Sequence, residues 1–347
     1  MSWTQPNNPI SFPGLGLQLG DIPTGFAIGS LNIRFYGVVI AIGLLLAVFY
    51  GLKRSKEFGL KEDDILDGVL GIVPFAIICA RLYYCAFKWD MYAANPVKIL
   101  YIWEGGLAIY GGVIGAAIGV VVFSLIKKVK LGAVLDLVAI AFLIGQFIGR
   151  WGNFFNREAF GQVTESILRM ELVNPETGVF GAWHPTFLYE SLWNLAGFIL
   201  LHLLSKRRQY DGQMALSYVF WYGLGRALIE GLRMDSLMLG SFRVSQLLAA
   251  LTCFAAAAAL LILSFRKHDK KKLFVNRVAA REAALAEEAA EPAEETTEEA
   301  TEETAEETTE EATEETAEEA TEEATEETAE EATEEATEEA TEETENS

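Results

Sequence analysis

The sequence predicts an all-α, polytopic membrane protein with about seven transmembrane helices, followed by a disordered acidic tail. Three observations support this fold class: long apolar runs, basic residues in alternate loops, and an abrupt change of composition near the C-terminus. The apolar runs lie at residues 31–52, 65–87, 107–126, 132–150, 186–204, 213–232 and 243–265. Each run approaches the ~20 residues with which a helix spans a bilayer. A helix also bonds its own backbone groups, as lipid requires.

Basic residues predict the orientation of these spans. They gather after the first, third, fifth and seventh runs, at Lys53, Arg54, Lys56, Lys61, Lys127, Lys128, Lys130, Lys206, Arg207, Arg208, Arg266, Lys267 and Lys270 to Lys272. Loops rich in Lys and Arg stay on the cytoplasmic side, so we expect the N-terminus outside and the C-terminus inside. No basic segment precedes the first run, which we therefore interpret as a span and not as a signal peptide.

The C-terminal part differs from the rest of the chain. Residues 281–347 hold 31 of the 49 acidic residues, which leaves 18 acidic residues against 26 Lys and Arg in the preceding part. A Glu-rich repeat without an apolar stripe favours disorder. We therefore predict a membrane domain at 1–272 and a basic, then acidic, low-complexity cytoplasmic tail at 273–347. No nucleic-acid partner is expected, and Cys79, Cys85 and Cys253 lack metal-binding spacing.

The stretch "GRWGNFFNREAFG" places unusual polarity at the end of the fourth apolar run. With the predicted orientation, the other polar residues of the spans also fall in the outer half. They are Arg34, Tyr36, Arg81, Glu104, Tyr110, Arg150, Asn153, Asn156, Arg157, Glu158, His184, Tyr189, Glu190, Tyr222, Arg226, Glu230 and Arg233. Since loop charge alone set the orientation, this agreement predicts one polar site open to the outer leaflet.

The sixth run carries four of these residues on one face. Positions 222, 226, 230 and 233 fall within about 80° when each residue turns the helix by ~100°. Charges inside a bilayer normally face the interior in pairs, and Arg226 with Glu230 has the i, i+4 spacing of an ion pair. This pair fits either a structural lock or a functional site. Arg150 and Arg81 lie at the same predicted depth, and surplus guanidinium groups there suit a phosphate.

Several of the remaining features have two interpretations. The glycines of residues 105–119 allow close helix packing, or they expose backbone N–H groups to an anion. Gly149, Gly152 and Gly161 are expected to let the fourth helix end and the chain fold over. Aromatic residues near the outer interface fit an ordinary aromatic belt. His184, before Pro185, is either a helix-start residue or a base.

Five motifs together resemble the prolipoprotein diacylglyceryl transferase family. They are "RFYG" at 34–37, "GGLAIYGG" at 105–112, "GRWGNFFNREAFG" at 149–161, "HPTFLYE" at 184–190 and "YGLGRALIEGLR" at 222–233. The resemblance covers about residues 10–265 and leaves the acidic tail outside. It implies a multi-pass enzyme of the bacterial cytoplasmic membrane, surrounded by membrane lipids, that needs no cofactor. Its substrates would be phosphatidylglycerol and preprolipoprotein signal peptides with a lipobox cysteine, and its products a thioether and glycerol 1-phosphate.

The resemblance also implies roles for individual residues. Arg150 would bind the lipid phosphate. The catalytic set would be Arg150, Arg226, Glu230, Arg233, Tyr110 and Glu158, and the substrate-binding set Arg150, Asn153, Gly161, Tyr36, Tyr222 and Arg81. Many family members have His where this chain has Tyr110. Because tyrosine has a reference pKa near ~10, Tyr110 is a poor base at neutral pH.

The implied reaction is a displacement at carbon by the thiol of the substrate. Cationic surroundings lower a thiol pKa, and they stabilise a departing phosphate oxygen. Arginine keeps its proton near neutrality, which leaves Glu230 or Glu158 either to accept the thiol proton or to orient arginine. A transporter, a lipid-binding scaffold and an intramembrane protease are the alternatives. The protease lacks a suitably placed Ser/His pair, Asp pair or zinc motif, and a transporter would need polar residues through both halves of the membrane.

Overall fold

Seven long helices dominate the computed structural model, which describes residues 8–29, 31–234, 238–239 and 242–287. They are α1 (Phe35–Arg54), α2 (Glu62–Phe87), α4 (Ile109–Ile126), α5 (Leu131–Asn156), α6 (Thr186–Ser205), α7 (Gln213–Ile229) and α8 (Val244–Ser264). Within the described residues, six of these helices are long and apolar enough to cross a membrane, and α7 has 17 residues. The protein is therefore a mostly helical, polytopic membrane protein, and a span by α7 stays a prediction.

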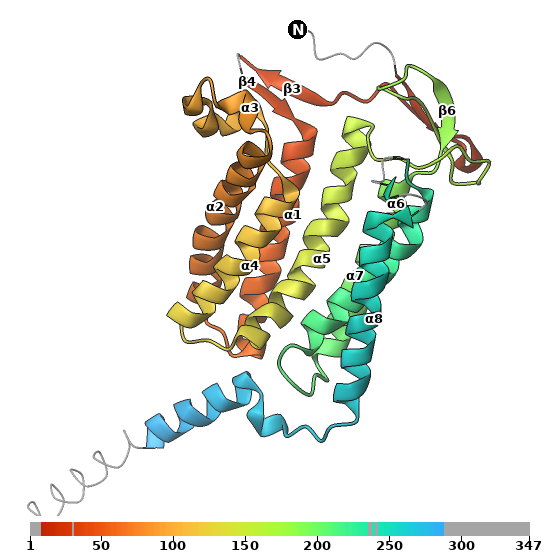
Figure 1. Ribbon diagram of the computed structural model, residues 1–347. Coiled ribbons are helices and arrows are strands. Elements are labelled where there is room, and N and C mark those ends of the chain that lie inside the picture. The colour runs from red at the N-terminus through yellow and green to blue at the C-terminus, as the bar shows by residue number, and fades with distance from the viewer. Residues whose placement is uncertain (1–7, 30, 235–237, 240–241, 288–347) are drawn as a thin grey trace, which may run out of the picture. The chain divides into compact units, whose positions relative to one another are not determined.

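The helix α5 lies at the centre of the bundle. It packs against α1, α6 and α7, while α2 pairs with α4 and α7 pairs with α8 (Figure 1). Its buried residues Leu137, Ile140 and Leu143 form a core with Leu201 of α6 and Met214 of α7. Because α5 packs against both α6 and α7, a side chain near its end lies within reach of both helices.

Glycines set the close packing of α4 on α2. Gly111, Gly115 and Gly119 recur every four residues, and a Cβ atom at Gly115 would lie 2.6 Å from the Cβ atom of Cys79. The backbone N–H of Gly112 already donates to Ala108 O at 3.2 Å. These contacts favour the packing interpretation of the glycines over an anion site.

Eight short strands in the described part of the chain show that the expected all-α architecture was incomplete. A four-stranded antiparallel sheet has the order β2 (Leu17–Gly20), β1 (Ile10–Phe12), β5 (Met170–Val173), β6 (Phe180–Trp183). Two further antiparallel pairs are β3 (Gly25–Ile28) with β4 (Leu31–Arg34), and β7 (Met238–Leu239) with β8 (Phe242–Arg243). The start of the first apolar run is thus a strand. Alternating residues of β1 and β5 form a second small core with Phe154, Phe160, Trp183 and Phe187.

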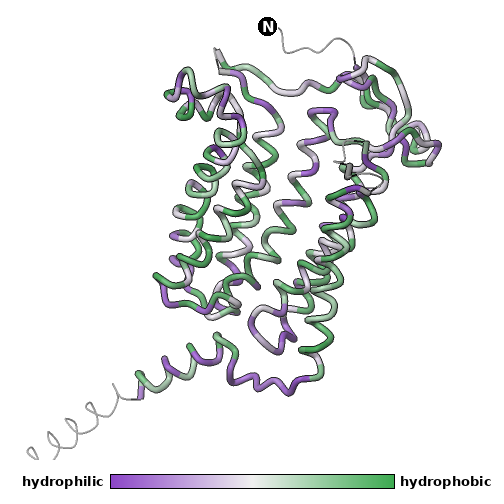
Figure 2. Tube along the Cα trace, viewed as in Figure 1, coloured by the Kyte–Doolittle hydropathy of each residue, from purple (hydrophilic) through white to green (hydrophobic). Residues whose placement is uncertain are grey.

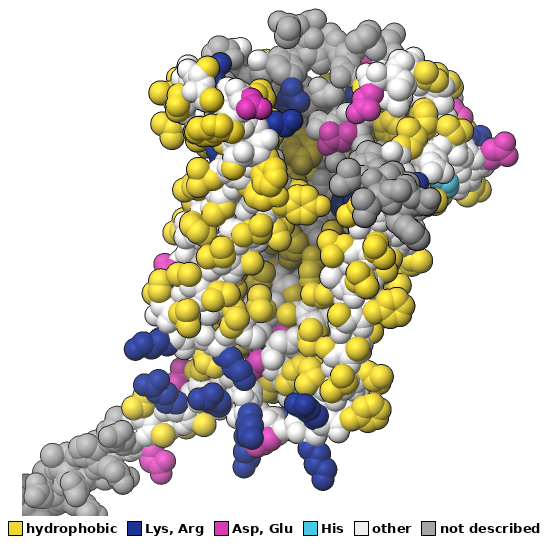
Figure 3. Space-filling view, in the orientation of Figure 1, with side chains coloured by type: hydrophobic (Ala, Val, Ile, Leu, Met, Phe, Trp, Pro, Cys, Tyr) yellow, Lys and Arg dark blue, Asp and Glu magenta, His cyan; other side chains and the backbone are white. Residues whose placement is uncertain are grey.

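The two ends of the bundle differ in chemistry. Hydrophobic residues follow the helices (Figure 2), and Lys and Arg gather at the end where α1 joins α2, α4 joins α5, and α6 joins α7 (Figure 3). We call this the basic end, and we call the opposite end, which carries the strands, the sheet end (Figure 1). At the basic end Lys127 contacts Asp64 and Asp67, and a hydrogen bond to Asp67 raises the pKa of Lys127.

All these elements belong to one compact unit, Met1–Ala279, and the second unit is Ala280–Ser347. The described part of the second unit, residues 280–287, is helical. Most of the predicted disordered tail, residues 288–347, lies outside the described residues. The predicted domain boundary at 272 stays a prediction.

Candidate active site

Two buried glutamates form the centre of the candidate site at the sheet end. Glu190 lies in the second turn of α6 and is 7% exposed, and Glu230 follows the last residue of α7 and is 1% exposed. Buried carboxylates are costly unless cations and hydrogen bonds surround them. Their positions therefore require cationic partners from neighbouring helices.

Three arginines supply those partners. Glu190 Oε2 pairs with Arg150 of α5, and Glu190 Oε1 lies 3.1 Å from Arg233 Nη1 and 3.5 Å from Arg226 Nη1. Arg226 Nη2 also lies 2.7 Å from Glu230 Oε2, so the i, i+4 ion pair expected from the sequence is confirmed. Glu190 thus joins α5, α6, α7 and the segment after α7. We call these five residues the arginine cluster.

The exposure of the arginine cluster is uneven. The side chains of Arg150 and Arg226 are 24% and 22% exposed, whereas that of Arg233 is 9% exposed. A shallow pocket beside the cluster is lined by Glu190, Tyr222 and Arg226, among others. Two guanidinium groups are therefore held in place by carboxylates while part of each stays accessible. That arrangement suits an anion with several oxygens, such as a phosphate.

The start of α8 contacts the same centre. Ser245 Oγ donates to Glu230 Oε1, and Arg243 donates to the backbone oxygen of Glu230. Gln246 Nε2 donates to Ala227 O at 2.8 Å. The sequence did not predict Arg243, Ser245, Gln246 or Glu190 as site residues. It placed Glu190 in the outer half of the membrane, but only the fold reveals that Glu190 meets three arginines.

Arg233 reaches the cluster from an extended segment, which corrects the expectation that it shares a helical face with Tyr222 and Arg226. The helix α7 ends at Ile229, a 3-10 turn covers Glu230–Leu232, and Arg233 has φ −79° and ψ 150°. The backbone at Gly161 and Gln162 contacts this extended segment. Gln162 N donates to Leu232 O at 2.7 Å, and a Cβ atom at Gly161 would lie 2.6 Å from Leu232 O. Gly161 thus permits a close backbone approach that positions Arg233.

The helix α5 continues to Asn156, which corrects the expectation that Gly149 and Gly152 let it end. Both glycines instead face α1, and a Cβ atom at Gly152 would lie 2.7 Å from the Tyr36 ring. The predicted binding residue Tyr36 therefore packs against Gly152, two residues after Arg150 in α5. Further along, Asn153 Nδ2 donates to Glu158 Oε1 at 2.8 Å, and Glu158 is exposed.

Arg157 ends α5 in a left-handed conformation, with φ 51°. Its buried guanidinium donates to Asn8 O, Ile22 O and Asp21 Oδ1, and so fixes the N-terminal strands against α5. Burial lowers the pKa of Arg157, and the nearby Asp21 carboxylate opposes that shift. The arginine therefore has a structural role that is separate from the cluster.

Three further predicted residues have distinct surroundings. Arg81 is 4% exposed and donates to the backbone oxygens of Lys98, Ile99, Tyr101, Gly105 and Gly106. This geometry favours a structural role for Arg81 over the predicted phosphate contact. Tyr110 is 64% exposed in the first turn of α4. Tyr222 is 37% exposed and stacks on Tyr218, with ring centroids 5.8 Å apart.

His184 has the surroundings of a neutral, helix-start residue. Its Nδ1 lies 3.2 Å from the hydroxyl of Tyr189, and its backbone oxygen accepts a hydrogen bond from Gly161 N at 2.8 Å. Burial lowers the pKa of His184. Among the described residues, no group of three His, Cys, Asp or Glu side chains is placed to hold a metal ion.

A reciprocal tryptophan pair joins the two helices that carry the glutamates. Trp193 Nε1 donates to Trp221 O and Trp221 Nε1 donates to Trp193 O, each at 3.0 Å. The rings stack 4.4 Å apart, and each indole lies against a glycine of the opposite helix, Gly225 or Gly197. Because Glu190 and Arg226 lie about one turn from this pair, the contact fixes their separation.

The fold and this site define a polytopic membrane protein with an arginine-rich centre at one end of its bundle. The chain matches the prolipoprotein diacylglyceryl transferase family over residues 23–263. It belongs to that family, and the class expected from the sequence, a transferase, is confirmed.

Three bacterial relatives carry the name phosphatidylglycerol–prolipoprotein diacylglyceryl transferase. The protein of Limosilactobacillus reuteri (strain DSM 20016) is 42% identical over 271 residues, which cover 76% of this chain and 98% of the relative. That of Listeria innocua is 44% identical over 244 residues, covering 69% and 88%. That of Bacillus velezensis is 41% identical over 252 residues, covering 71% and 92%. The similarity thus spans nearly the whole of each relative.

Proposed function

We propose that this protein transfers the diacylglyceryl group of phosphatidylglycerol to the lipobox cysteine of a preprolipoprotein signal peptide. The thiol sulfur forms a bond to the glyceryl carbon, and the bond from that carbon to the phosphate oxygen breaks. The thiol proton leaves, and glycerol 1-phosphate is the departing group. The names of the relatives support the substrates, and the arginine cluster supports binding of the phosphate group that departs.

The observation that carries the proposal is that Arg150 and Arg226 are each fixed by Glu190 and still reach solvent. Their side chains stay 24% and 22% exposed. A phosphate that binds there receives preorganised donors, which stabilise the negative charge that grows on the departing oxygen. The same positive field lowers the pKa of an approaching thiol. Glu190 holds both of these partly exposed arginines, Glu230 also holds Arg226, and Arg233 pairs with the same two carboxylates.

Of the two carboxylates considered for the thiol proton, Glu158 is the better placed. Glu230 is 1% exposed and lies between Arg226 and Ser245, so a substrate thiol has little access to it. Glu158 is exposed and bonded to Asn153, which lies three residues after Arg150 on α5. In this proposal Asn153 orients Glu158, Tyr36 and Tyr222 line the lipid site, and exposed Tyr110 contributes a hydrogen bond to substrate.

The proposal includes a location. The basic end would face the cytoplasm of a bacterial inner membrane, as loops rich in Lys and Arg do. The arginine cluster, at the sheet end, would then meet the outer leaflet and the emerging signal peptide.

Reconstitution tests the proposal directly. The purified protein is placed in vesicles with phosphatidylglycerol labelled in its acyl chains and a peptide that contains a lipobox cysteine. We expect a thioether-linked product and stoichiometric glycerol 1-phosphate. A peptide with Ser in place of Cys is the matched control and should stay unlabelled. Lipid binding without product, in a folded protein, would instead favour a lipid-binding scaffold.

A further inference from the structure

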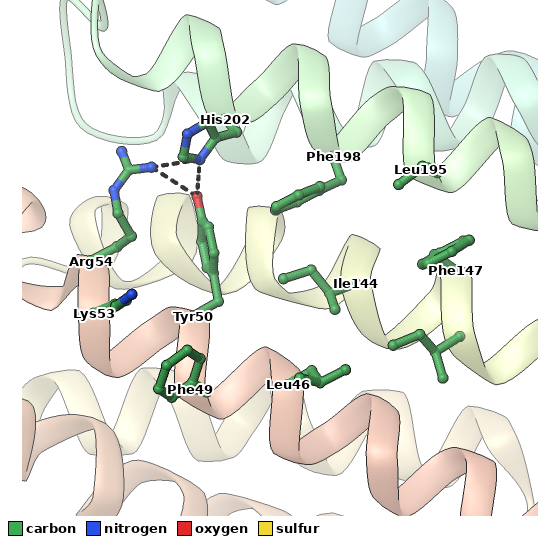
Figure 4. A pocket seen from close by; sticks show the side chains of 11 residues that line it. Leu46, Phe49, Tyr50, Lys53, Arg54, Ile144, Phe147, Leu195, Phe198 and His202 are labelled. Atoms are coloured by element: carbon green, nitrogen blue, oxygen red, sulfur yellow. Dashed lines mark hydrogen bonds between the residues drawn. The ribbon is translucent and has the colours of Figure 1, made fainter.

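A second, separate concavity lies toward the basic end, between α1, α5 and α6. Its volume is about 400 Å³, and its lining is almost wholly apolar, with Leu46, Phe49, Ile144, Phe147, Leu195 and Phe198. Figure 4 shows these side chains in a row that ends at Tyr50, Arg54 and His202. We call it the α1–α6 groove. Its volume falls within the ~300–1,000 Å³ of ligand pockets.

A polar network closes one end of the groove. Tyr50 Oη lies 3.0 Å from His202 Nδ1, Arg54 Nη1 lies 2.6 Å from the same nitrogen, and Arg54 Nη2 donates to Ser205 Oγ at 3.0 Å. These bonds link the last turns of α1 and α6 at the basic end. Because the helices that form the walls both pack on α5, the apolar part of the groove extends from this network toward the middle of the bundle.

Positive charge surrounds the closed end. Lys53 lines the groove and its Nζ lies 5.3 Å from the centre of the Phe49 ring, and the exposed Lys206 directly follows α6. The one acidic neighbour in this network, Glu57, is paired with Arg54. Neither Lys53 nor Lys206 takes part in an ion pair among the described residues. The apolar groove therefore ends beside one exposed lysine of its own lining, Lys53, and near a second, Lys206, which lies close to His202.

We propose that the α1–α6 groove binds one acyl chain of an anionic glycerophospholipid from the leaflet at the basic end, with its phosphate on Lys53 and Lys206. The acyl chain gains little free energy by moving from the bilayer into the groove, since lipid tails are as apolar as the groove. Selection therefore comes from headgroup charge, which basic residues at a membrane surface attract. This site goes beyond the proposed transfer reaction, because its polar end, at His202, lies at the opposite end of α6 from Glu190.

Photolabelling tests this inference. The full-length protein is placed in phosphatidylcholine vesicles that contain a small fraction of phosphatidylglycerol with a diazirine on one acyl chain. Labelled peptides are identified by mass spectrometry. We expect labelling of α1 near residues 46–54 and of α6 near residues 195–202. A phosphatidylcholine probe with the same chain should label these segments at least about fivefold less, because each of the two lysines contributes ~1 kcal/mol, a factor of about five.

Matched variants separate a site from ordinary surrounding lipid. Leu46→Trp fills the groove, while Leu45→Trp places the same ring on a neighbour that is 67% exposed. Lys53→Ala removes the rim charge, while Lys56→Ala removes a lysine whose side chain is 82% exposed outside the groove. We expect the first member of each pair to lose labelling and the second to keep it. Equal labelling within either pair, or by both probes, would overturn the proposal.

The Arg150→Ala variant distinguishes this site from the arginine cluster. Labelling of the groove should persist in that variant even if transfer stops, because the readout is binding and not turnover. Loss of groove labelling in folded Arg150→Ala protein would mean that the groove holds the tail of the transferase substrate, and the separate site would be refuted. Absence of transfer in the native protein, with selective groove labelling, would refute only the proposed function.

Discussion

Replacing Glu190 by Gln should disable the site more than any change to a single arginine contact. Both oxygens of Glu190 contact arginine, Oε2 with Arg150 and Oε1 with Arg226 and Arg233. Gln keeps the shape but presents an NH₂ group to a guanidinium whichever way it is turned. Three clustered cations then lose the carboxylate they share.

The magnitude follows from the burial of the partners. Breaking a buried ion pair by changing one member costs ~3–5 kcal/mol. The lower end applies here, because Arg150 and Arg226 are partly exposed and water can hydrate them. About 3 kcal/mol corresponds to a fall in melting temperature of roughly ten degrees. Displacement of the arginines by about 1 Å should lower the transfer rate about 100-fold.

Thermal unfolding in detergent and thioether formation in vesicles measure the two effects. Glu190→Asp should retain part of both properties, since it keeps the charge. Glu171→Gln is the matched control, because Glu171 pairs with Arg169 at 3.5 Å on a partly exposed strand, and exposed pairs contribute only ~0–1 kcal/mol. A Glu190→Gln protein with native melting temperature and native rate would refute the assignment of Glu190 as the centre of the cluster.

Four further outcomes are expected. Arg150→Lys should lose most transfer activity at equal protein level, because a point charge binds phosphate less specifically than a planar fork; near-native turnover would remove Arg150 from phosphate binding. Gly161→Ala should lower thermal stability by ~1–3 kcal/mol and slow transfer, since its methyl group meets Leu232 O; an unchanged protein would contradict the close approach. Tyr110→Phe should slow transfer about tenfold or less, because one hydrogen bond to a charged group contributes ~1.5–3 kcal/mol at most and neighbouring arginines share its role; a thousandfold loss repaired at high pH would instead make Tyr110 a base. Truncation after residue 287 should keep the catalytic rate in vesicles, and a large loss in folded protein would show that the tail contributes.

The helices could be predicted from the sequence because membrane thickness alone demands their length. The apolar runs at 65–87 and 107–126 agree with α2 and α4 within a few residues. The strands could not be predicted in this way, since a segment of three or four residues such as Ile10–Phe12 leaves no long run. Its partner in the small core, Leu172, is distant in the sequence.

The site was predicted in composition and only partly in geometry. Depth along separate helices correctly grouped Arg150, Arg226 and Arg233, which the structure brings together. The same reasoning treats one helix at a time. It therefore paired Arg226 with Glu230 on one helix, but it did not identify Glu190, from another helix, as the shared partner of the three arginines. It also placed Arg81 with the cluster, because depth says nothing of the backbone oxygens that surround a side chain.

The reciprocal tryptophan pair has a consequence for sequence variation in this chain. The indole of Trp193 occupies the space that a side chain at Gly225 would fill, and the indole of Trp221 does the same at Gly197. These four positions are therefore interdependent. A methyl group at either glycine displaces an indole, and each indole donates to the backbone oxygen of the other tryptophan. A single substitution therefore disturbs both halves at once, and no partial version of the contact remains. Change here should be tolerated only when several of the four positions change together.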